Sequence, residues 1–211
     1  MDQVKVKICG ITNLKDASIA VEFGAYALGF IFAESPRRIT PQKARAIINA
    51  IPPFVKTVGV FVNEAPTSIR QMIHNCGLDL VQLHGNESPA LCDGLMPNAI
   101  KALRIKDESS LQTSQAYQGK VRALLLDTYV NEKIGGTGKT FDWDLAIKIK
   151  KLGMPIILSG GLGPLNIRRA IKTVRPYAVD VNSGVEEHPG KKSHILIRDL
   201  MEKVRQEEFS E

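Results

Sequence analysis

Lys7 and Cys9 are the first residues along the chain whose types and spacing suit acid–base chemistry. Residues 4–8 alternate apolar and polar side chains, which indicates a strand with one face toward helices and one toward a sheet interior. Lys7 and Cys9 share the second face, so the Lys7 ammonium favours a Cys9 thiolate, which can serve as a base. A lone cysteine is more often a small buried hydrophobe, and the spacing leaves both interpretations open.

Two aspartates lie at or near the ends of later apolar runs, Asp127 in residues 121–127 and Asp180 in residues 177–181. A carboxylate that ends an apolar strand is costly to bury unless it is paired or used in a reaction. Asp127 is therefore a catalytic candidate, with a helix cap or a loop ion pair as the alternative. If the sheet closes on itself, the last strand neighbours the first, and Asp180 is the expected partner of Lys7. Such a pair can be structural or catalytic.

Glycine-rich segments follow the last two β-rich runs, at residues 159–162 and 182–185. Glycines there expose backbone N–H groups, and a helix N-terminus adds partial positive charge that attracts phosphate. One such loop is weak evidence, because glycine also serves tight turns, but two at these strand ends are more specific. The phosphate-binding candidates are Gly160, Gly161, Ser183 and Gly184.

Three further polar residues are expected near the same site. Arg37 and Arg38 follow the second β-rich run, where one guanidinium can bind a carboxylate or phosphate, although a solvated turn is the alternative. Gln82 and His84 share one face at the end of another run and are substrate-binding candidates together with Lys7, Asp180 and one of the two arginines, although a lone histidine is more often structural. Residues 128–140 lack the glycine spacing of a P-loop and are interpreted as a lid over the site or as a surface loop.

The elements that position these residues repeat as a β-rich run, a turn and a helical run. Helix starts are expected at Asn13, Thr40, Ser88 and Asp142, and Gly77 is expected to end a helix. Eight such units in 211 residues predict an α/β fold, a (β/α)₈ TIM barrel forming a single domain over residues 1–211. The eight predicted strands are residues 4–8, 26–32, 57–62, 79–83, 100–103, 121–127, 155–158 and 177–181.

Composition excludes several other classes of protein. With 44% hydrophobic and 24% charged residues the chain is neither disordered nor fibrous, and no apolar run is long enough to span a membrane. Three dispersed cysteines favour a reducing, cytoplasmic location. The four histidines are scattered, so no metal and no other cofactor is expected. The net charge of +6 is dispersed along the chain, which favours a small phosphorylated substrate over nucleic acid.

The order of the motifs resembles that of the phosphoribosylanthranilate isomerase family over essentially the whole chain. Asn182 stands where the family more often has serine, and asparagine still offers hydrogen bonds. The matching segments are KICGIT (7–12), GFIF (29–32), SPRR (35–38), VGVFVN (58–63), VQLHG (81–85), LLDT (125–128), GGTGKTFDW (135–143), LSGGL (158–162) and VDVNSGVE (179–186).

The resemblance implies a barrel enzyme of tryptophan biosynthesis that uses no cofactor. It would convert N-(5-phosphoribosyl)anthranilate to 1-(2-carboxyphenylamino)-1-deoxyribulose 5-phosphate by an Amadori rearrangement. By the same resemblance Cys9 is the general base and Asp127 the general acid. Arg38 would hold the anthranilate carboxylate, Asp180 would contact the sugar, and the loops at Gly161 and Gly184 would bind phosphate.

Two alternatives remain at this stage. Another phosphosugar barrel is one. A pentose-phosphate epimerase, however, would need metal-binding histidines and carboxylates, and a histidine-pathway isomerase would need an aspartate in place of Cys9. The other is a barrel that binds small anions without catalysis, and the presence of both Cys9 and Asp127 argues against it. The sequence leaves open whether the protein is a monomer or a homodimer.

Overall fold

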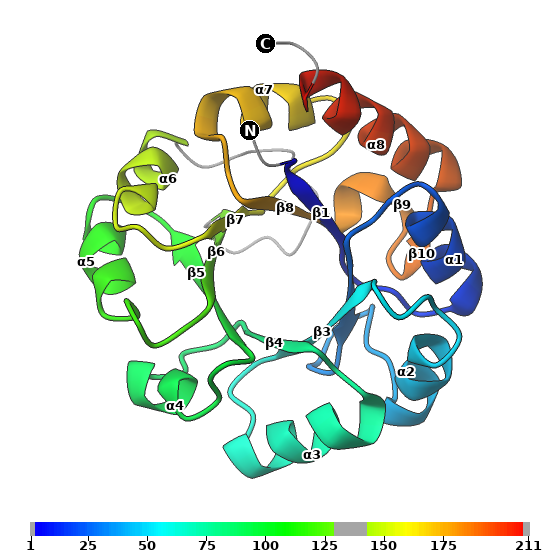
Figure 1. Cartoon of the computed structure of the whole chain (residues 1–211), viewed down its shortest axis with the longest axis horizontal. Helices are drawn as coiled ribbons and strands as arrows, with labels where there is room; N and C mark the ends of the chain where they lie inside the picture. Colours follow the sequence, from blue (N-terminus) through cyan, green and yellow to red (C-terminus); the bar gives the residue numbers. More distant parts are fainter. Residues whose placement is uncertain (1–2, 129–142, 209–211) are drawn as a thin grey trace.

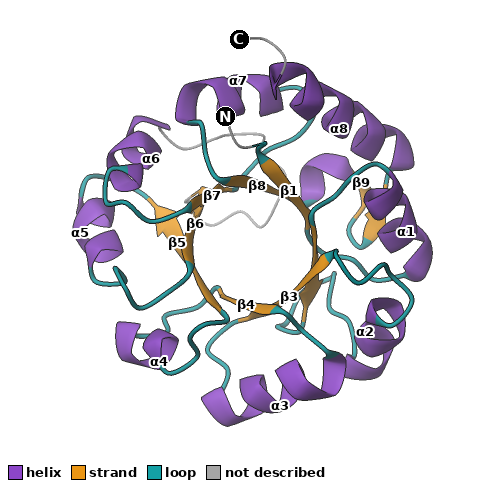
Figure 2. Ribbon diagram, viewed as in Figure 1, coloured by secondary structure: helices purple, strands orange, loops and turns teal. Residues whose placement is uncertain are grey.

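A computed structural model describes residues 3–128 and 143–208 and shows a closed barrel of eight parallel strands in the order β1 to β8. The helices surround the ring of strands (Figures 1 and 2). This arrangement confirms the predicted (β/α)₈ barrel. The strands are β1 (Lys5–Ile8), β2 (Ala27–Ile31), β3 (Lys56–Phe61), β4 (Leu80–Leu83), β5 (Ala99–Ile105), β6 (Ala123–Thr128), β7 (Ile156–Leu158) and β8 (Ala178–Val181).

The helices alternate with the strands along the chain. They are α1 (Leu14–Glu22), α2 (Pro41–Ile48), α3 (Pro66–Cys76), α4 (Pro89–Asp93), α5 (Ser109–Gln115), α6 (Trp143–Lys150), α7 (Ile167–Val174) and α8 (His194–Glu208). A short 3₁₀ helix, η1 (Ser183–Val185), and a small hairpin of β9 (Glu186–His188) and β10 (Lys191–Lys192) precede α8. Among these helices none is long and apolar enough to cross a membrane.

Alternation along the strands separates two apolar layers. Val6 and Ile8 of β1 join the large core between strands and helices, while Lys7 points into the barrel, as the sequence pattern predicted. A second, smaller cluster fills the barrel interior and lies below the polar residues that gather at the carboxyl ends of the strands. It consists of Ile100, Ala102, Ala123, Leu125, Ile157 and Ala178.

Local capping explains where several helices begin and end. The side chains of Asn13, Thr40 and Ser88 each accept a hydrogen bond from a backbone N–H in the first turn of the following helix, which confirms three predicted starts. Gly77 ends α3 with a φ of 75°, a left-handed conformation that glycine adopts without steric cost. The cap predicted at Asp142 lies outside the described residues.

The predicted strand bounds differ most from the structure at β5, at β6, which begins at Ala123 and not at Val121, and after β8. β5 extends to Ile105, two residues beyond the predicted end, because Arg104 and Ile105 pair with Asp127 and Thr128 of β6. The hairpin of β9 and β10 was not predicted, because Glu186–His188 and Lys191–Lys192 carry no strand-like apolar pattern.

A buried ion pair holds the turn between β4 and α4, which carries His84. Lys101 Nζ lies 2.7 Å from a Glu87 carboxylate oxygen and also donates to the carbonyl oxygens of Leu83 and Gly85, on either side of His84. Burial raises the pKa of Glu87, but the hydrogen bonds from Lys101 and from the backbone N–H of Asn63 outweigh burial and lower it. The turn is therefore fixed by a buried ion pair, and removal of either partner would strongly lower the stability of the fold.

We predict that Lys101→Met lowers the free energy of unfolding by about 3–5 kcal/mol, because it leaves the Glu87 carboxylate buried without its cation. Urea denaturation measures this change. Lys120→Met is the matched control, because Lys120 and Asp93 form an exposed pair whose loss costs about 1 kcal/mol or less. Equal effects of the two substitutions would contradict the structural role of Lys101.

Candidate active site

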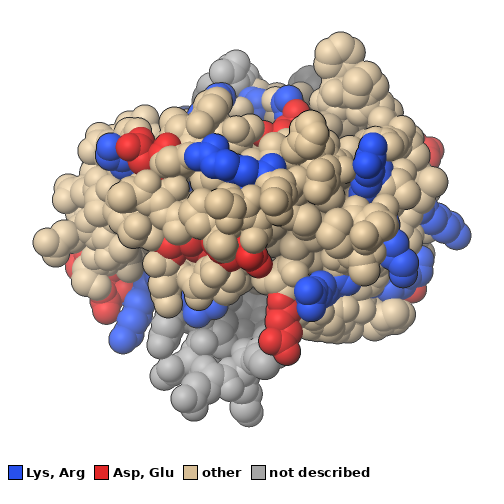
Figure 3. Space-filling view, turned by 90° about the horizontal axis from the view of Figure 1, so that it is seen from below, with Lys and Arg blue, Asp and Glu red and all other residues tan. Residues whose placement is uncertain are grey.

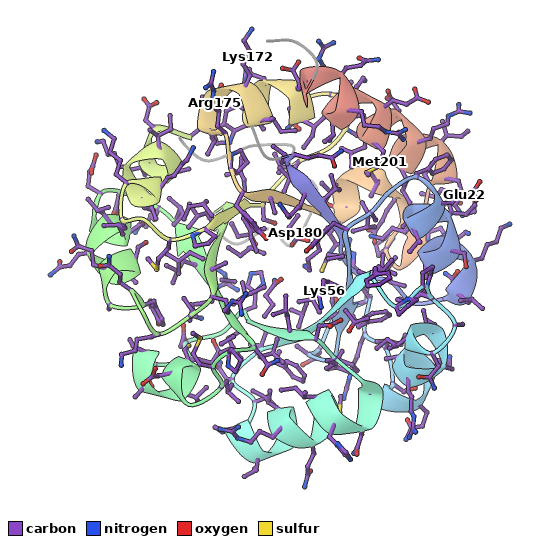
Figure 4. All side chains as sticks on the ribbon, in the orientation of Figure 1. Glu22, Lys56, Lys172, Arg175, Asp180 and Met201 are labelled. Atoms are coloured by element: carbon purple, nitrogen blue, oxygen red, sulfur yellow. The ribbon has the colours of Figure 1, made fainter. Side chains whose placement is uncertain are left out.

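Lys7 links the last strand of the barrel to the first. Lys7 and Asp180 are register partners of β1 and β8, and Lys7 Nζ lies 2.8 Å from Asp180 Oδ1. Both side chains are 5% exposed, and Asp180 projects into the barrel interior (Figure 4). Burial alone lowers the pKa of Lys7, but Asp180 and Cys9 together outweigh burial and raise it. The ammonium is thus retained, and the predicted Lys7–Asp180 pair is confirmed.

Cys9 follows β1 and lies beside Lys7 in the interior of the barrel. It is buried, and a Cβ at position 29 would come within 2.7 Å of its Sγ, so Gly29 leaves room for the sulfur. Burial raises the pKa of the Cys9 thiol, and although Lys7 acts in the opposite direction, the net shift is upward. Lys7 therefore favours the thiolate, as the sequence suggested. Burial has the larger effect, so the pKa of the thiol lies above its ordinary value.

A second ammonium, that of Lys192, lies near Cys9 and was missed by the sequence analysis. Its side chain is fully buried and its Nζ donates to Asn182 Oδ1 at 3.0 Å and to Glu186 Oε1 at 3.0 Å. Arg37 forms a two-pronged ion pair with the same Glu186 carboxylate. Burial lowers the pKa of Lys192 even though Glu186 opposes this effect. Nothing in the dipeptide Lys191-Lys192 distinguishes it from a surface pair.

Two hydrogen bonds and one short polar contact connect Lys7 to the other catalytic candidate, Asp127. Lys7 Nζ donates to Gln82 Oε1 at 2.9 Å, and Gln82 Nε2 lies 2.9 Å from His84 Nδ1. His84 Nε2 in turn lies 3.2 Å from Asp127 Oδ2, with both side chains about one-quarter exposed. We call Asp180, Lys7, Gln82, His84 and Asp127 the polar row. The sequence placed Gln82 and His84 on one face but did not predict the contact with Asp127.

The two glycine-rich loops meet at their backbones. A Cβ at Gly184 would collide with the carbonyl oxygen of Leu162, and one at Gly163 would lie 3.1 Å from the Gly184 carbonyl oxygen. Gly160 and Gly161 have φ values of 85° and 63°, which other residues rarely adopt. Gly161 and Ser183 are exposed at this junction. The loops that were predicted to bind phosphate therefore pack against each other where they follow β7 and β8.

Arg38 lies apart from the polar row among the described contacts. Its side chain is exposed and lines a cavity of about 510 Å³ between the ends of β2 and β3 and the starts of α2 and α3. Phe32 and Phe61, whose stacked rings have centroids 5.3 Å apart, line the same cavity. Arg37 is engaged with Glu186, so Arg38 is the arginine of the pair that is open to a ligand.

Two further expectations from the sequence concern a lid over the site and the absence of a metal ion. The lid proposed for residues 128–140 falls almost entirely outside the described residues. Within residues 3–128 and 143–208 there is no group of three histidine, cysteine or carboxylate side chains arranged to hold a metal ion. Basic and acidic side chains are interspersed on the face shown in Figure 3, without a continuous basic surface there.

An eight-stranded barrel with acid–base candidates and a glycine-lined loop pair at the carboxyl ends of its strands defines a TIM-barrel enzyme for a small phosphorylated substrate. Residues 6–203 match the family of N-(5'-phosphoribosyl)anthranilate (PRA) isomerase. The chain belongs to this family, which confirms the resemblance found in the sequence.

Individual relatives match over nearly their whole length. N-(5'-phosphoribosyl)anthranilate isomerase of Geobacter sulfurreducens is 52% identical over 96% of this chain and 98% of its own. The crystal structure of the Thermotoga maritima isomerase superposes with a TM-score of 0.91 at 46% identity, covering 97% of this chain and all of that one. A solved isomerase in complex with reduced 1-(o-carboxyphenylamino)-1-deoxyribulose 5-phosphate has a TM-score of 0.87 at 42% identity, with the same coverage.

We predict that Gly184→Ala weakens the binding of inorganic phosphate and also destabilises the fold, because the added methyl group pushes the loop at Leu162 away. The expected loss of stability is about 1–3 kcal/mol, as for other overpacked sites. Competition by phosphate against substrate and urea denaturation measure the two effects. Gly94→Ala is the control, because a Cβ there meets its neighbours at 3.4 Å or more. Unchanged phosphate competition in Gly184→Ala would remove this loop from the site.

We also predict that the Cys9 thiolate forms at higher pH than the thiolate of an ordinary cysteine, because burial raises the pKa of the Cys9 thiol. The difference in thiolate absorbance between wild type and Cys9→Ser follows this ionisation. Lys7→Gln should move it to still higher pH, because the substitution removes the cation that favours the thiolate. A folded protein that holds this proton loses stability as the pH rises above the pKa of the unfolded thiol. A thiolate already present at pH 7 would contradict the prediction.

Proposed function

We propose that this chain converts N-(5-phosphoribosyl)anthranilate to 1-(2-carboxyphenylamino)-1-deoxyribulose 5-phosphate, with Cys9 as general base and Asp127 as general acid. The observation that carries the proposal is the polar row, which links the acid candidate on β6 to Lys7, beside the base candidate that follows β1. The rearrangement needs one acid and one base, each acting on a different atom of the ribose.

The first step opens the furanose ring. A protonated Asp127 gives its proton to the ring oxygen as the bond between that oxygen and C1 breaks, and the nitrogen lone pair forms the iminium. The carboxylate that remains on Asp127 is stabilised by His84, whose Nε2 lies 3.2 Å from Asp127 Oδ2. The negative charge that develops in this step therefore lies next to His84, which stabilises it when Nε2 carries a hydrogen.

The second step removes a proton from C2 of the ribose. The iminium acidifies this proton, and the Cys9 thiolate takes it, so that the electrons of the C–H bond form the enolamine. The enolamine then tautomerises to the ketone product. Lys7 and Lys192 favour the thiolate against the cost of burial, and the positive charge of the iminium acts in the same direction.

Three binding roles complete the proposal. The backbone groups at Gly160, Gly161, Ser183 and Gly184 receive the phosphate, which a helix N-terminus further attracts. Arg38 binds the anthranilate carboxylate, and its cavity offers the aromatic walls of Phe32 and Phe61. Asp180 contacts the sugar while it holds Lys7. A solved relative is in complex with reduced 1-(o-carboxyphenylamino)-1-deoxyribulose 5-phosphate. This complex supports a ligand that carries a carboxylate, a sugar and a phosphate.

The remaining expectations stay predictions of this proposal. The protein acts in the cytoplasm in tryptophan biosynthesis, as a single domain over residues 1–211, and as a monomer or a homodimer. It needs no cofactor or metal. A fluorescence assay that follows the loss of N-(5-phosphoribosyl)anthranilate tests the activity directly. Turnover should persist after exhaustive chelation, and no turnover of this substrate would overturn the proposed function.

We predict that Cys9→Ser and Asp127→Asn each lower kcat by about 10²–10⁴-fold, the usual effect of losing a general base or acid. Binding of a product analogue should largely survive, because neither residue is assigned to the phosphate or the carboxylate. Steady-state kinetics and calorimetric titration measure the two effects. Cys76→Ser is the control, because Cys76 is a buried cysteine at the end of α3. Near-normal turnover of Cys9→Ser would return Cys9 to a structural role.

A further inference from the structure

The polar row consists of three hydrogen bonds, from Asp180 through Lys7 and Gln82 to His84, and of the contact of 3.2 Å between His84 Nε2 and Asp127 Oδ2. The direction of the hydrogen bonds is fixed at the Lys7 end. Asp180 and Lys7 occupy neighbouring strands, Gln82 and His84 lie at the end of β4, and Asp127 is on β6. Gln82 is 1% exposed, and both polar atoms of its amide are engaged within the row. Its neighbours, rather than solvent, therefore determine which way the amide faces.

The direction follows from the donors and acceptors that each side chain can offer. An ammonium group only donates, so the Gln82 atom that faces Lys7 at 2.9 Å must be the carbonyl oxygen. The Gln82 NH₂ then faces His84 Nδ1 at 2.9 Å and donates to it, which requires a lone pair on Nδ1. A neutral imidazole with a lone pair on Nδ1 carries its hydrogen on Nε2, the atom next to Asp127.

We propose that Gln82 is a positioning residue that holds His84 as the Nε2–H tautomer, so that His84 donates to Asp127 Oδ2 and the transferable proton of the acid is carried on Oδ1. The inference rests on the proposed function, in which Asp127 is the general acid. In a protonated carboxyl the carbonyl oxygen is the stronger acceptor, so an Nε2–H that faces Oδ2 favours the acidic hydrogen on Oδ1. When Asp127 gives up its proton, the same donor stabilises the carboxylate that forms.

The opposite tautomer would work against the reaction. With hydrogen on Nδ1, the lone pair of Nε2 would face Asp127 Oδ2, and the contact at 3.2 Å would require the hydrogen of the acid to lie between them. The acid would then donate to His84 instead of to the substrate. Lys7 thus acts at a distance on the acid, through the orientation of one amide.

Two substitutions at position 82 separate this role from simple packing. Gln82→Glu keeps the size of the side chain and an oxygen for Lys7, but it presents an oxygen to Nδ1 and so demands a hydrogen there. If Gln82 served only to fill space and anchor Lys7, glutamate would replace it well. Gln82→Met keeps a similar volume and removes both hydrogen bonds, which allows His84 either tautomer.

The direct test is the two-bond ¹H–¹⁵N spectrum of the full-length protein at pH 8, where an ordinary histidine is neutral because its pKa is about 6.5. Labelling all four histidines and comparing with His84→Gln assigns the signals of this ring. Wild type should show hydrogen on Nε2, Gln82→Glu should show hydrogen on Nδ1, and Gln82→Met should show a mixture. Hydrogen on Nδ1 in wild type, or no change in either variant, would overturn the inference.

Kinetics test whether the tautomer matters for turnover. Gln82→Glu and Gln82→Met should each lower kcat by about ten- to a hundredfold with little change in KM, as expected when a reacting group is misplaced while substrate still binds. A Gln82→Glu protein that shows the reversed tautomer but wild-type kcat would overturn the positioning role. Full activity of Asp127→Asn would instead overturn the proposed general acid, while the spectra would still decide the tautomer. If Gln82→Glu does not fold, wild type and Gln82→Met decide both questions.

Discussion

The buried ammonium of Lys7 is the interaction on which the rest of the site depends. A charge removed from water is costly unless carboxylate and polar atoms replace the water, and Asp180 and Gln82 do so at 2.8 and 2.9 Å. Because Asp180 lies on β8 and Lys7 on β1, the same pair spans the seam at which the barrel closes. Closure of the fold and the electrostatics around Cys9 therefore depend on one side chain.

The position of His84 is determined from both sides of the ring of strands. From inside the barrel, Gln82 contacts the imidazole. From the other face of β5, where Lys101 alternates with the interior residues Ile100 and Ala102, a second buried ammonium binds the backbone around His84. Lys101 fixes the turn and Gln82 fixes the ring. A catalytic carboxyl on a third strand, that of Asp127, is then oriented by groups that are themselves held in place.

Strand periodicity explains how much of this site the sequence could predict. The Lys7–Asp180 pair followed from alternation in two strands and from the closure of a barrel. Contacts made by residues beyond strand ends were not predictable in this way. Lys192 looked like half of a surface lysine pair, and only the hairpin of β9 and β10 returns it to Asn182 and Glu186. Likewise, no spacing rule relates His84 to Asp127, because their strands are not neighbours.

The chemistry of Cys9 shows why the surrounding charges must be considered together with burial. The sequence placed a cation next to the thiol and suggested a thiolate, but the enclosure that allows Lys7 to act strongly also removes water from the sulfur. Desolvation has the larger effect, so the pKa of the thiol lies above its ordinary value despite Lys7 and Lys192. An iminium formed beside it would add positive charge at the moment when a base is needed. The ring-opening step driven by Asp127 thereby prepares the proton removal assigned to Cys9.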